Sequence, residues 1–132
     1  MTVHAAVAAS YMRKAERALD EARLLVLGAK SEGACNRAYY AMHDAAHAAL
    51  LAAGFESPDA IIKTHPNLIA KFGKKLVLGG QIDATHGRAF NRVQQMRLLA
   101  DYSAEPPPHE DAQGAVEKAE AFVAAVKRKF GL

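Results

Sequence analysis

One segment of this 132-residue chain, residues 36–51, constrains the fold more than any other. Between Ala38 and Ala53 the sequence has no Lys, Arg or Glu, and Asp44 is its only carboxylate. A helix without a charged outer face is normally enclosed by other helices on most sides. We therefore predict that this segment is the central helix of a helical bundle.

On a helical wheel of about 100° per residue, the polar side chains of this segment gather along one ridge. The ridge consists of Asn36, Tyr40, His43 and His47, with Arg37 and Asp44 beside it. Alanines from Ala34 to Ala52 lie broadly opposite. Buried polar groups are nearly always hydrogen-bonded, so the ridge needs partners within the chain, across a subunit interface or in a ligand. We expect function along this ridge, with Tyr40 and Asp44 buried and hydrogen-bonded.

Helical periodicity covers five segments of the chain, which Gly, Pro and other turn residues separate. The expected helices span about residues 7–28, 31–54, 64–79, 83–102 and 109–129. The expected N-terminal caps are Ser31 for the second helix, Thr64 or His65 ahead of Pro66 for the third, and Asp83 or Thr85 for the fourth. The sequence shows no competing strand pattern, no internal repeat and no domain boundary. The sequence predicts an all-α fold, an antiparallel up-and-down bundle of four to five helices in one domain, residues 1–132.

The composition excludes several functional classes. Cys35 is the only cysteine, which rules out an intramolecular disulfide and the cysteine-based metal motifs. The first ten residues lack a basic region, and Arg13 and Lys14 follow soon after, unlike a signal peptide or a membrane span. We expect a cytoplasmic protein with no membrane partner. The formal net charge is +3, and the positive residues occur along the chain rather than in one run, so the composition permits contact with nucleic acid without arguing for it.

Two histidines have the spacing of a metal site. His43 and His47 are four residues apart on one helix face, with Asp44 adjacent, as in many zinc sites. However, no Glu follows His43 and no third ligand is identifiable, so histidines hydrogen-bonded in the core or at an interface are favoured over metal ligands. His65 is expected to cap a helix. We therefore expect no metal and no cofactor.

The segment 87–102 carries a second set of polar residues. One face of the expected helix holds Asn91, Gln94, Arg97 and Asp101, and another side holds Arg92, Gln95, Leu99 and Tyr102. The four-residue spacing of Arg97 and Asp101 predicts an intrahelical ion pair. A helix that is polar on two sides can line a cleft for an anion. We expect Arg92, Arg97 and Tyr102 to line one such cleft, close to their copies in the second subunit of a dimer.

Three motifs in this chain resemble the prokaryotic HEPN (higher eukaryotes and prokaryotes nucleotide-binding) domains, especially the small stand-alone, toxin-like branch. They are Asn-Arg-Ala-Tyr-Tyr-Ala-Met at 36–42, Lys-Thr-His at 63–65 followed by Phe-Gly-Lys at 72–74, and Asn-Arg at 91–92 with Arg-Leu-Leu-Ala-Asp-Tyr at 97–102. The resemblance covers about residues 10–130. It implies a helical bundle that forms a homodimer, and a link to RNA cleavage or nucleotide binding. Many such relatives are toxins encoded beside a minimal nucleotidyltransferase antitoxin.

The resemblance also implies roles for individual residues. Arg97 and Arg92 would hold a phosphate of RNA or a nucleotide, and Asn91 would orient that phosphate. Asp101 would position the Arg97 side chain, and Tyr102 would contact the substrate. Arg37 and Tyr40 would complete the binding set, with Asn36 and Asp44 supporting it. A tyrosine close to the position of Tyr102 is nucleotidylated by the partner in related toxins.

One departure leaves the activity open. The ribonucleases of this family share an Arg, four to six intervening residues and a His, whereas Arg97 is followed by Asp101, Tyr102 and Ser103, with no His before His109. Arg37 and His43 satisfy the spacing, but lie about 120° apart on one helix. A metal-independent endoribonuclease would therefore lack its usual general acid/base. The alternative is a non-enzymatic, dimeric interaction module in which the same residues form a buried polar network.

Overall fold

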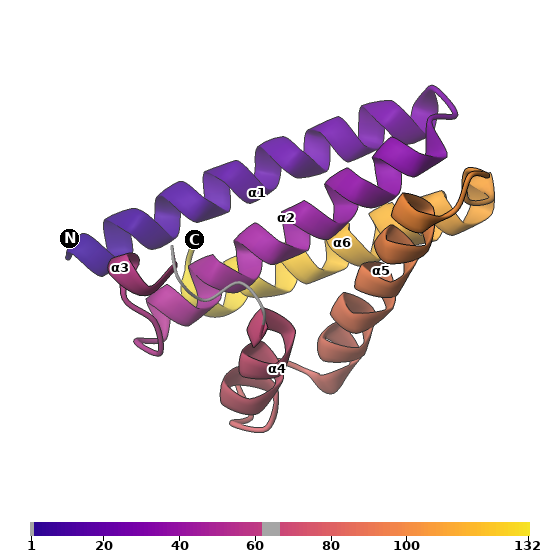
Figure 1. Cartoon of the computed structure of the whole chain (residues 1–132). Helices are drawn as coiled ribbons and strands as arrows, with labels where there is room; N and C mark the ends of the chain where they lie inside the picture. The colour runs from indigo at the N-terminus through magenta and orange to yellow at the C-terminus, as the bar shows by residue number, and fades with distance from the viewer. Residues whose placement is uncertain (1, 62–66) are drawn as a thin grey trace.

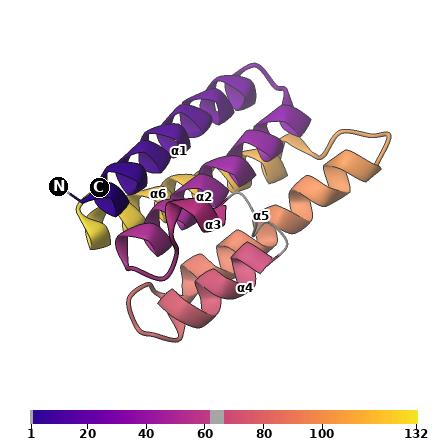
Figure 2. The same ribbon diagram turned by 60° about the vertical axis from the view of Figure 1, so that its left-hand side comes forward.

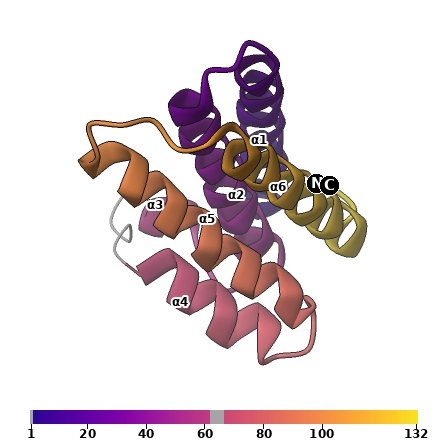
Figure 3. The same ribbon diagram turned by 90° about the vertical axis from the view of Figure 1, so that its right-hand side faces the viewer.

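The computed structural model describes residues 2–61 and 67–132, and these residues form helices with no strand among them. The helices are α1 (Val3–Leu27), α2 (Ser31–Ala52), α3 (Pro58–Ile61), α4 (Leu68–Phe72), the π-helix η2 (Gly73–Val77), α5 (Ala84–Tyr102) and α6 (His109–Phe130). α1, α2 and α6 lie side by side, and α4 and α5 form a second layer that packs on α2 (Figures 1, 2 and 3). The predicted all-α, antiparallel bundle is confirmed.

α2 is the central helix, as its sequence predicts. Every residue from Ala41 to Leu51 is buried, because α1, α6, α5 and α4 all pack against this helix. The alanine face, including Ala34, Ala38 and Ala45, is fully buried. The small side chains of this face bring α1 and α6 close to the α2 backbone, leaving the larger polar residues to occupy the remaining core space.

Three buried phenylalanines attach the second layer to the rest of the bundle. The ring centroid of Phe90 in α5 lies 5.9 Å from that of Phe72 in α4 and 5.1 Å from that of Phe122 in α6. The rings of Phe72 and Phe122 are 5.0 Å apart. Because all three side chains are fully buried, this aromatic cluster holds α4, α5 and α6 together at one point.

Two of the predicted helix starts need correction. The first helix begins at Val3 rather than near residue 7, because the side chain of Thr2 accepts a hydrogen bond from the Ala5 backbone N–H and caps the helix earlier. Ser31 is a buried residue inside α2 and not its cap; Lys30 holds the cap position without a side-chain hydrogen bond. The predicted cap at Asp83 is confirmed by its 2.9 Å hydrogen bond from the Thr85 backbone N–H.

The predicted third helix differs most from its expected form. Its expected start at Thr64, His65 and Pro66 lies outside the described residues. From Leu68 onward, the chain forms one turn of α-helix and then the π-helix η2, in which the Leu78 backbone N–H bonds to the Gly73 carbonyl five residues before it. π-helical turns occur frequently at functional sites, and Gly73 and Val77 of η2 line a cavity.

The remaining helix ends follow the Gly and Pro positions. Gly54, Gly80 and Gly131 all have positive φ just after a helix, the conformation that glycine adopts without strain. Three prolines, Pro106–Pro108, separate α5 from α6. No helix of the described chain has the length and apolar character needed to cross a lipid bilayer.

Candidate anion-binding site

The Arg97 side chain is held between α5 and α2. Its Nη1 donates to Oδ2 of Asp101 at 3.0 Å, which confirms the predicted ion pair. Its guanidinium carbon lies 4.5 Å from the ring centroid of Tyr39 and 5.7 Å from that of Tyr40. The Arg97 side chain is 19% exposed, whereas that of Asp101 is 40% exposed. The structure thus orients a guanidinium that is mostly buried and keeps some contact with solvent.

Tyr39 connects Arg97 to its surroundings. It is 7% exposed and contacts the rings of Tyr40, His43 and Phe90. Burial raises the pKa of Tyr39, and the positive charge of Arg97 and a hydrogen bond from Gln94 partly oppose this rise. The phenol is therefore held neutral, and its ring face offers the cation–π contact that positions Arg97.

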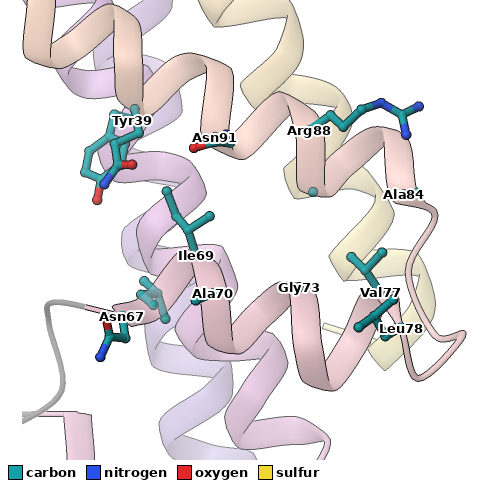
Figure 4. Close-up of a pocket in the computed structure, with 13 residues that line it drawn as sticks. Tyr39, Asn67, Ile69, Ala70, Gly73, Val77, Leu78, Ala84, Arg88 and Asn91 are labelled. Carbon is teal, nitrogen blue, oxygen red and sulfur yellow. The ribbon is translucent and has the colours of Figure 1, made fainter.

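A cavity of about 640 Å³ opens beside Tyr39, between the α4–η2 segment and α5 (Figure 4). Its lining includes Tyr39, Asn67, Ile69, Gly73, Val77, Gly87, Arg88, Asn91 and Gln94. Ile69 and Val77 point from α4 and η2 toward α5, and Asn91 extends along α5 on the side of Tyr39, whereas Arg88 extends outward (Figure 4). Asn91, Gln94, Arg97 and Asp101 thus lie along one face of α5, with the first two residues in the cavity and the last two beyond it.

Part of the polar ridge of α2 is buried, as predicted. His43, Asp44 and His47 are buried with partners inside the chain, whereas Asn36, Arg37 and Tyr40 are only partly buried. Nδ1 of His47 lies 3.1 Å from Oε2 of Glu56, with both side chains fully buried. Nδ1 of His43 lies 3.3 Å from Oδ1 of Asp44, which is 3% exposed. No group of three or more potential metal ligands occurs among the described residues. Tyr40 is only partly buried, and its described contacts are with aromatic rings and guanidinium groups.

Several predicted site residues lie apart from Arg97. Arg92 projects about 140° around α5 from Arg97 and lines a different cavity, of about 260 Å³, next to the three prolines. Tyr102 is 87% exposed. The expected cleft of Arg92, Arg97 and Tyr102 is therefore not formed within one protomer, and it stays a prediction that depends on a second subunit.

Arg37 and Arg97 contact the same Tyr40 ring. The guanidinium carbon of Arg37 lies 5.6 Å from the ring centroid and that of Arg97 lies 5.7 Å from it. Arg37 also pairs with Glu21 of α1, with Nε 3.4 Å from Oε2. Asn36 is partly buried near the start of α2. α2 is continuous from Ser31 to Ala52, so Arg37 and His43 do not converge within a protomer. Of the predicted set, the structure gathers Arg97, Asp101, Tyr40 and Arg37, and it places Asn91 one turn beyond Gln94 on the same α5 face.

Sequence reasoning missed three kinds of residue. Tyr39 was overlooked because the helical wheel assigned function to its neighbour Tyr40. Glu56 follows α2 in a loop, where periodicity carries no information about its partner. The cavity residues Ile69, Val77 and Arg88 were missed because nothing in the sequence indicates which face of η2 opposes α5.

Comparisons with known proteins agree with this arrangement. The HEPN domain family matches residues 8–129. The chain is 32% identical over 114 residues to the "Putative toxin MJ0605" of Methanocaldococcus jannaschii, covering 86% of this chain and 81% of that protein. It is 29% identical over 119 residues to a UPF0332 protein of Thermotoga maritima, covering 89% and 86%, and 34% identical over 91 residues to a UPF0332 protein of Gloeobacter violaceus, covering 69% and 68%. The matched region contains all the helices that surround Arg97, and the chain belongs to the HEPN domain family.

Proposed function

We propose that this chain is a toxin-like HEPN protein that binds a phosphate of RNA or of a nucleotide at Arg97. We further propose that it acts in the cytoplasm as a homodimer, beside a minimal nucleotidyltransferase antitoxin. The name of the Methanocaldococcus relative supports the toxin-like assignment. The observation that carries phosphate binding is the Arg97 guanidinium, oriented by two tyrosine rings and paired with one partly exposed carboxylate.

The Arg97 geometry suits phosphate recognition. A guanidinium offers several donors in a fixed plane and binds phosphate through parallel hydrogen bonds. Contacts with Tyr39 and Tyr40 restrict the side chain before any ligand arrives, which lowers the entropy lost on binding. Asp101 is 40% exposed, so an incoming phosphate can compete with it for Nη1 at the solvent side. Asp101 then acts as a counter-charge that holds Arg97 until the ligand binds.

The residues beyond Arg97 favour binding over cleavage. Metal-independent RNA cleavage needs a general acid/base close to the reacting hydroxyl. With four to six residues intervening after Arg97, the corresponding positions hold Tyr102, Ser103 and Ala104, and no imidazole. We therefore propose RNA or nucleotide binding as the activity of the described site. Cleavage of the same RNA is measured in parallel with its binding.

The proposal is tested by fluorescence anisotropy with a labelled single-stranded RNA. Arg97→Ala is expected to weaken binding about tenfold or more and to reduce the salt dependence of the affinity by about one phosphate contact. Arg17→Ala removes the same charge from the exposed surface of α1, and we expect it to bind within about threefold of the parent protein. Equal affinities for the two variants would refute phosphate binding at Arg97.

The dimer is tested separately. Leu99 and Tyr102 of α5 are 68% and 87% exposed, and large exposed apolar groups close together on one helix suit a subunit interface. Sedimentation equilibrium at micromolar concentration is expected to show a dimer, and Leu99→Glu is expected to weaken it. Leu24→Glu is the matched control, because Leu24 is 70% exposed on α1. A monomer of 14.2 kDa for the parent chain would contradict the proposal.

The rival function is a non-enzymatic interaction module. The observation that favours it is the low exposure of the Arg97 side chain, 19%, with both tyrosines against it, which also suits a purely structural contact between α2 and α5. If Arg97→Ala is destabilised yet binds RNA as tightly as the parent protein, Arg97 is a structural residue and the rival function replaces ours.

A further inference from the structure

We propose that the cavity between the α4–η2 segment and α5 is a nucleobase site, which takes one base of a single-stranded RNA whose backbone contacts Arg97. This inference rests on the proposed function. It adds a contact with the base of the RNA, which is separate from the phosphate contact at Arg97. The cavity volume of about 640 Å³ lies within the range of about 300–1,000 Å³ that is typical of small-molecule sites.

The walls of the cavity suit the flat faces of a base. Ile69 points into the space from α4 and Val77 from η2, opposite α5 (Figure 4). Both side chains are partly buried and pack against the core, so they present fixed apolar surface rather than mobile groups. Gly87 on α5 lies opposite Val77, and a Cβ there would approach Val77 Cγ2 to 3.2 Å. The two walls therefore meet at this end, and the space available to a base, here called the slot, lies farther along α5, beside Asn91 and Gln94.

The edge of the cavity toward Arg97 carries the polar groups. Asn91 and Gln94 are in the lining, and the Asn91 side chain extends toward Tyr39 (Figure 4). A side-chain amide offers both a donor and an acceptor, which is why Asn and Gln read base edges in nucleic-acid complexes. Asn91 is exposed, so its amide can reach a ligand. An apolar slot with amide groups along one edge matches the surface of a nucleobase.

The charge of this layer suits a polyanion. Residues 67–102 contain six cationic side chains and two carboxylates, a net charge of +4, whereas the whole chain carries +3. The rest of the chain is therefore slightly acidic, at −1, and the positive charge is concentrated in the α4–η2–α5 layer. Of these side chains, Arg88 of α5 is exposed and lines the cavity, so it attracts a phosphate backbone to this face.

Two residues, Tyr39 of α2 and Gln94 of α5, connect the cavity with the Arg97 site. Tyr39 lines the cavity and also contacts the guanidinium of Arg97. Gln94 lies one helical turn before Arg97 on the same face of α5 and bonds to Tyr39. A nucleotide with its base in the slot therefore has its sugar and phosphate at the end where Arg97 lies.

Gly73 provides a variant that fills the cavity without disturbing the fold. It lies in the lining, and a Cβ added there meets no atom within 4 Å. Its φ of −60° and ψ of −48° are ordinary helical angles that every residue except proline adopts. Gly73→Leu should therefore fill the slot, and Gly73→Ala is the matched control, since it adds only a methyl group.

The experiment uses the full chain and two probes. The first is adenosine, which has a base and no phosphate and is titrated by NMR. The second is a single-stranded nonameric RNA, compared with a nonamer of the same charge in which every base is absent. We expect adenosine to shift backbone resonances of α4, η2 and α5 in the parent protein and in Gly73→Ala, but not in Gly73→Leu. We expect Gly73→Leu to lower the affinity for the normal RNA about tenfold, to that of the abasic RNA.

The two proposals fail in different ways. If Gly73→Leu binds adenosine and RNA like the parent protein, or if normal and abasic RNA bind equally to the parent protein, the nucleobase site is refuted while phosphate binding at Arg97 stands. If adenosine binds in the slot but no RNA binds, the base site is supported and the RNA-binding part of the proposed function falls. Circular dichroism and the melting temperature of Gly73→Leu establish that its fold is retained.

Discussion

Replacing Phe90 with Ala tests how the second layer is attached to the bundle. Phe90 is fully buried, and its ring lies among Phe72 of α4, Phe122 of α6 and Tyr39 of α2. It is the point where four helices meet. Removing it creates a cavity that backbone movement cannot close easily, because each of the surrounding rings is held by a different helix.

The expected cost follows from this packing. Truncation of a buried Phe to Ala typically costs about 3–5 kcal/mol of unfolding free energy, and full burial among rings from three other helices places Phe90 in the upper part of that range. Phe90→Leu keeps most of the apolar volume and loses the aromatic pairs with Phe72 and Phe122, each worth about 0.5–1.5 kcal/mol. We therefore expect about 1–3 kcal/mol for Leu. A chain of this length has a total stability of about 7–20 kcal/mol, so both variants should still fold.

Urea denaturation at one fixed protein concentration, followed by circular dichroism, measures these differences. Leu24→Ala is the surface control, since Leu24 is 70% exposed and such substitutions usually change stability by less than about 0.5 kcal/mol. A loss below about 1.5 kcal/mol for Phe90→Ala, at an unchanged denaturant slope, would refute the idea that this residue attaches α5 to the other helices.

Three further outcomes can be checked with simple assays. Asp44→Ala should lower the unfolding free energy by about 1–3 kcal/mol, because it removes the carboxylate beside His43; urea denaturation within about 0.5 kcal/mol of the parent protein would contradict this. Hydrogen bonds from Thr85 lower the pKa of Asp83, so its stabilising effect is present above the unfolded value of 3.8 and is lost as pH falls through the lower folded value. The difference in melting temperature between the parent protein and Asp83→Ala should accordingly be constant above about pH 5 and shrink in acid. Burial, with a smaller contribution from Asp111, raises the pKa of the Cys35 thiol to about 11, so at pH 8 a thiol reagent should label folded protein at least about a hundredfold more slowly than unfolded protein; comparable rates would show that the thiol is accessible.

The helices themselves could be predicted from the sequence because their causes are local. The near-absence of charged side chains between Ala38 and Ala53, where Asp44 is the only one, determines that α2 is enclosed. Gly54 ends α2 and the prolines separate α5 from α6, because glycine adopts positive φ without strain and proline fixes φ and lacks a backbone N–H. The Arg97–Asp101 ion pair also follows from sequence spacing alone, because residues four apart on a helix are neighbours whatever else the chain does.

The site could be predicted only in part, because helical periodicity relates residues of one helix to each other and not to the helices around them. It could not show that Tyr39, rather than Tyr40, lies closer to Arg97, or that His47 pairs with Glu56 from the following loop. It placed Arg92 and Arg97 in one cleft, whereas α5 presents them to different surroundings. The slot between η2 and α5 exists only when the two segments pack side by side. Tertiary packing therefore decided which polar residues meet, since those contacts join residues far apart in sequence whose proximity depends on how whole helices are oriented.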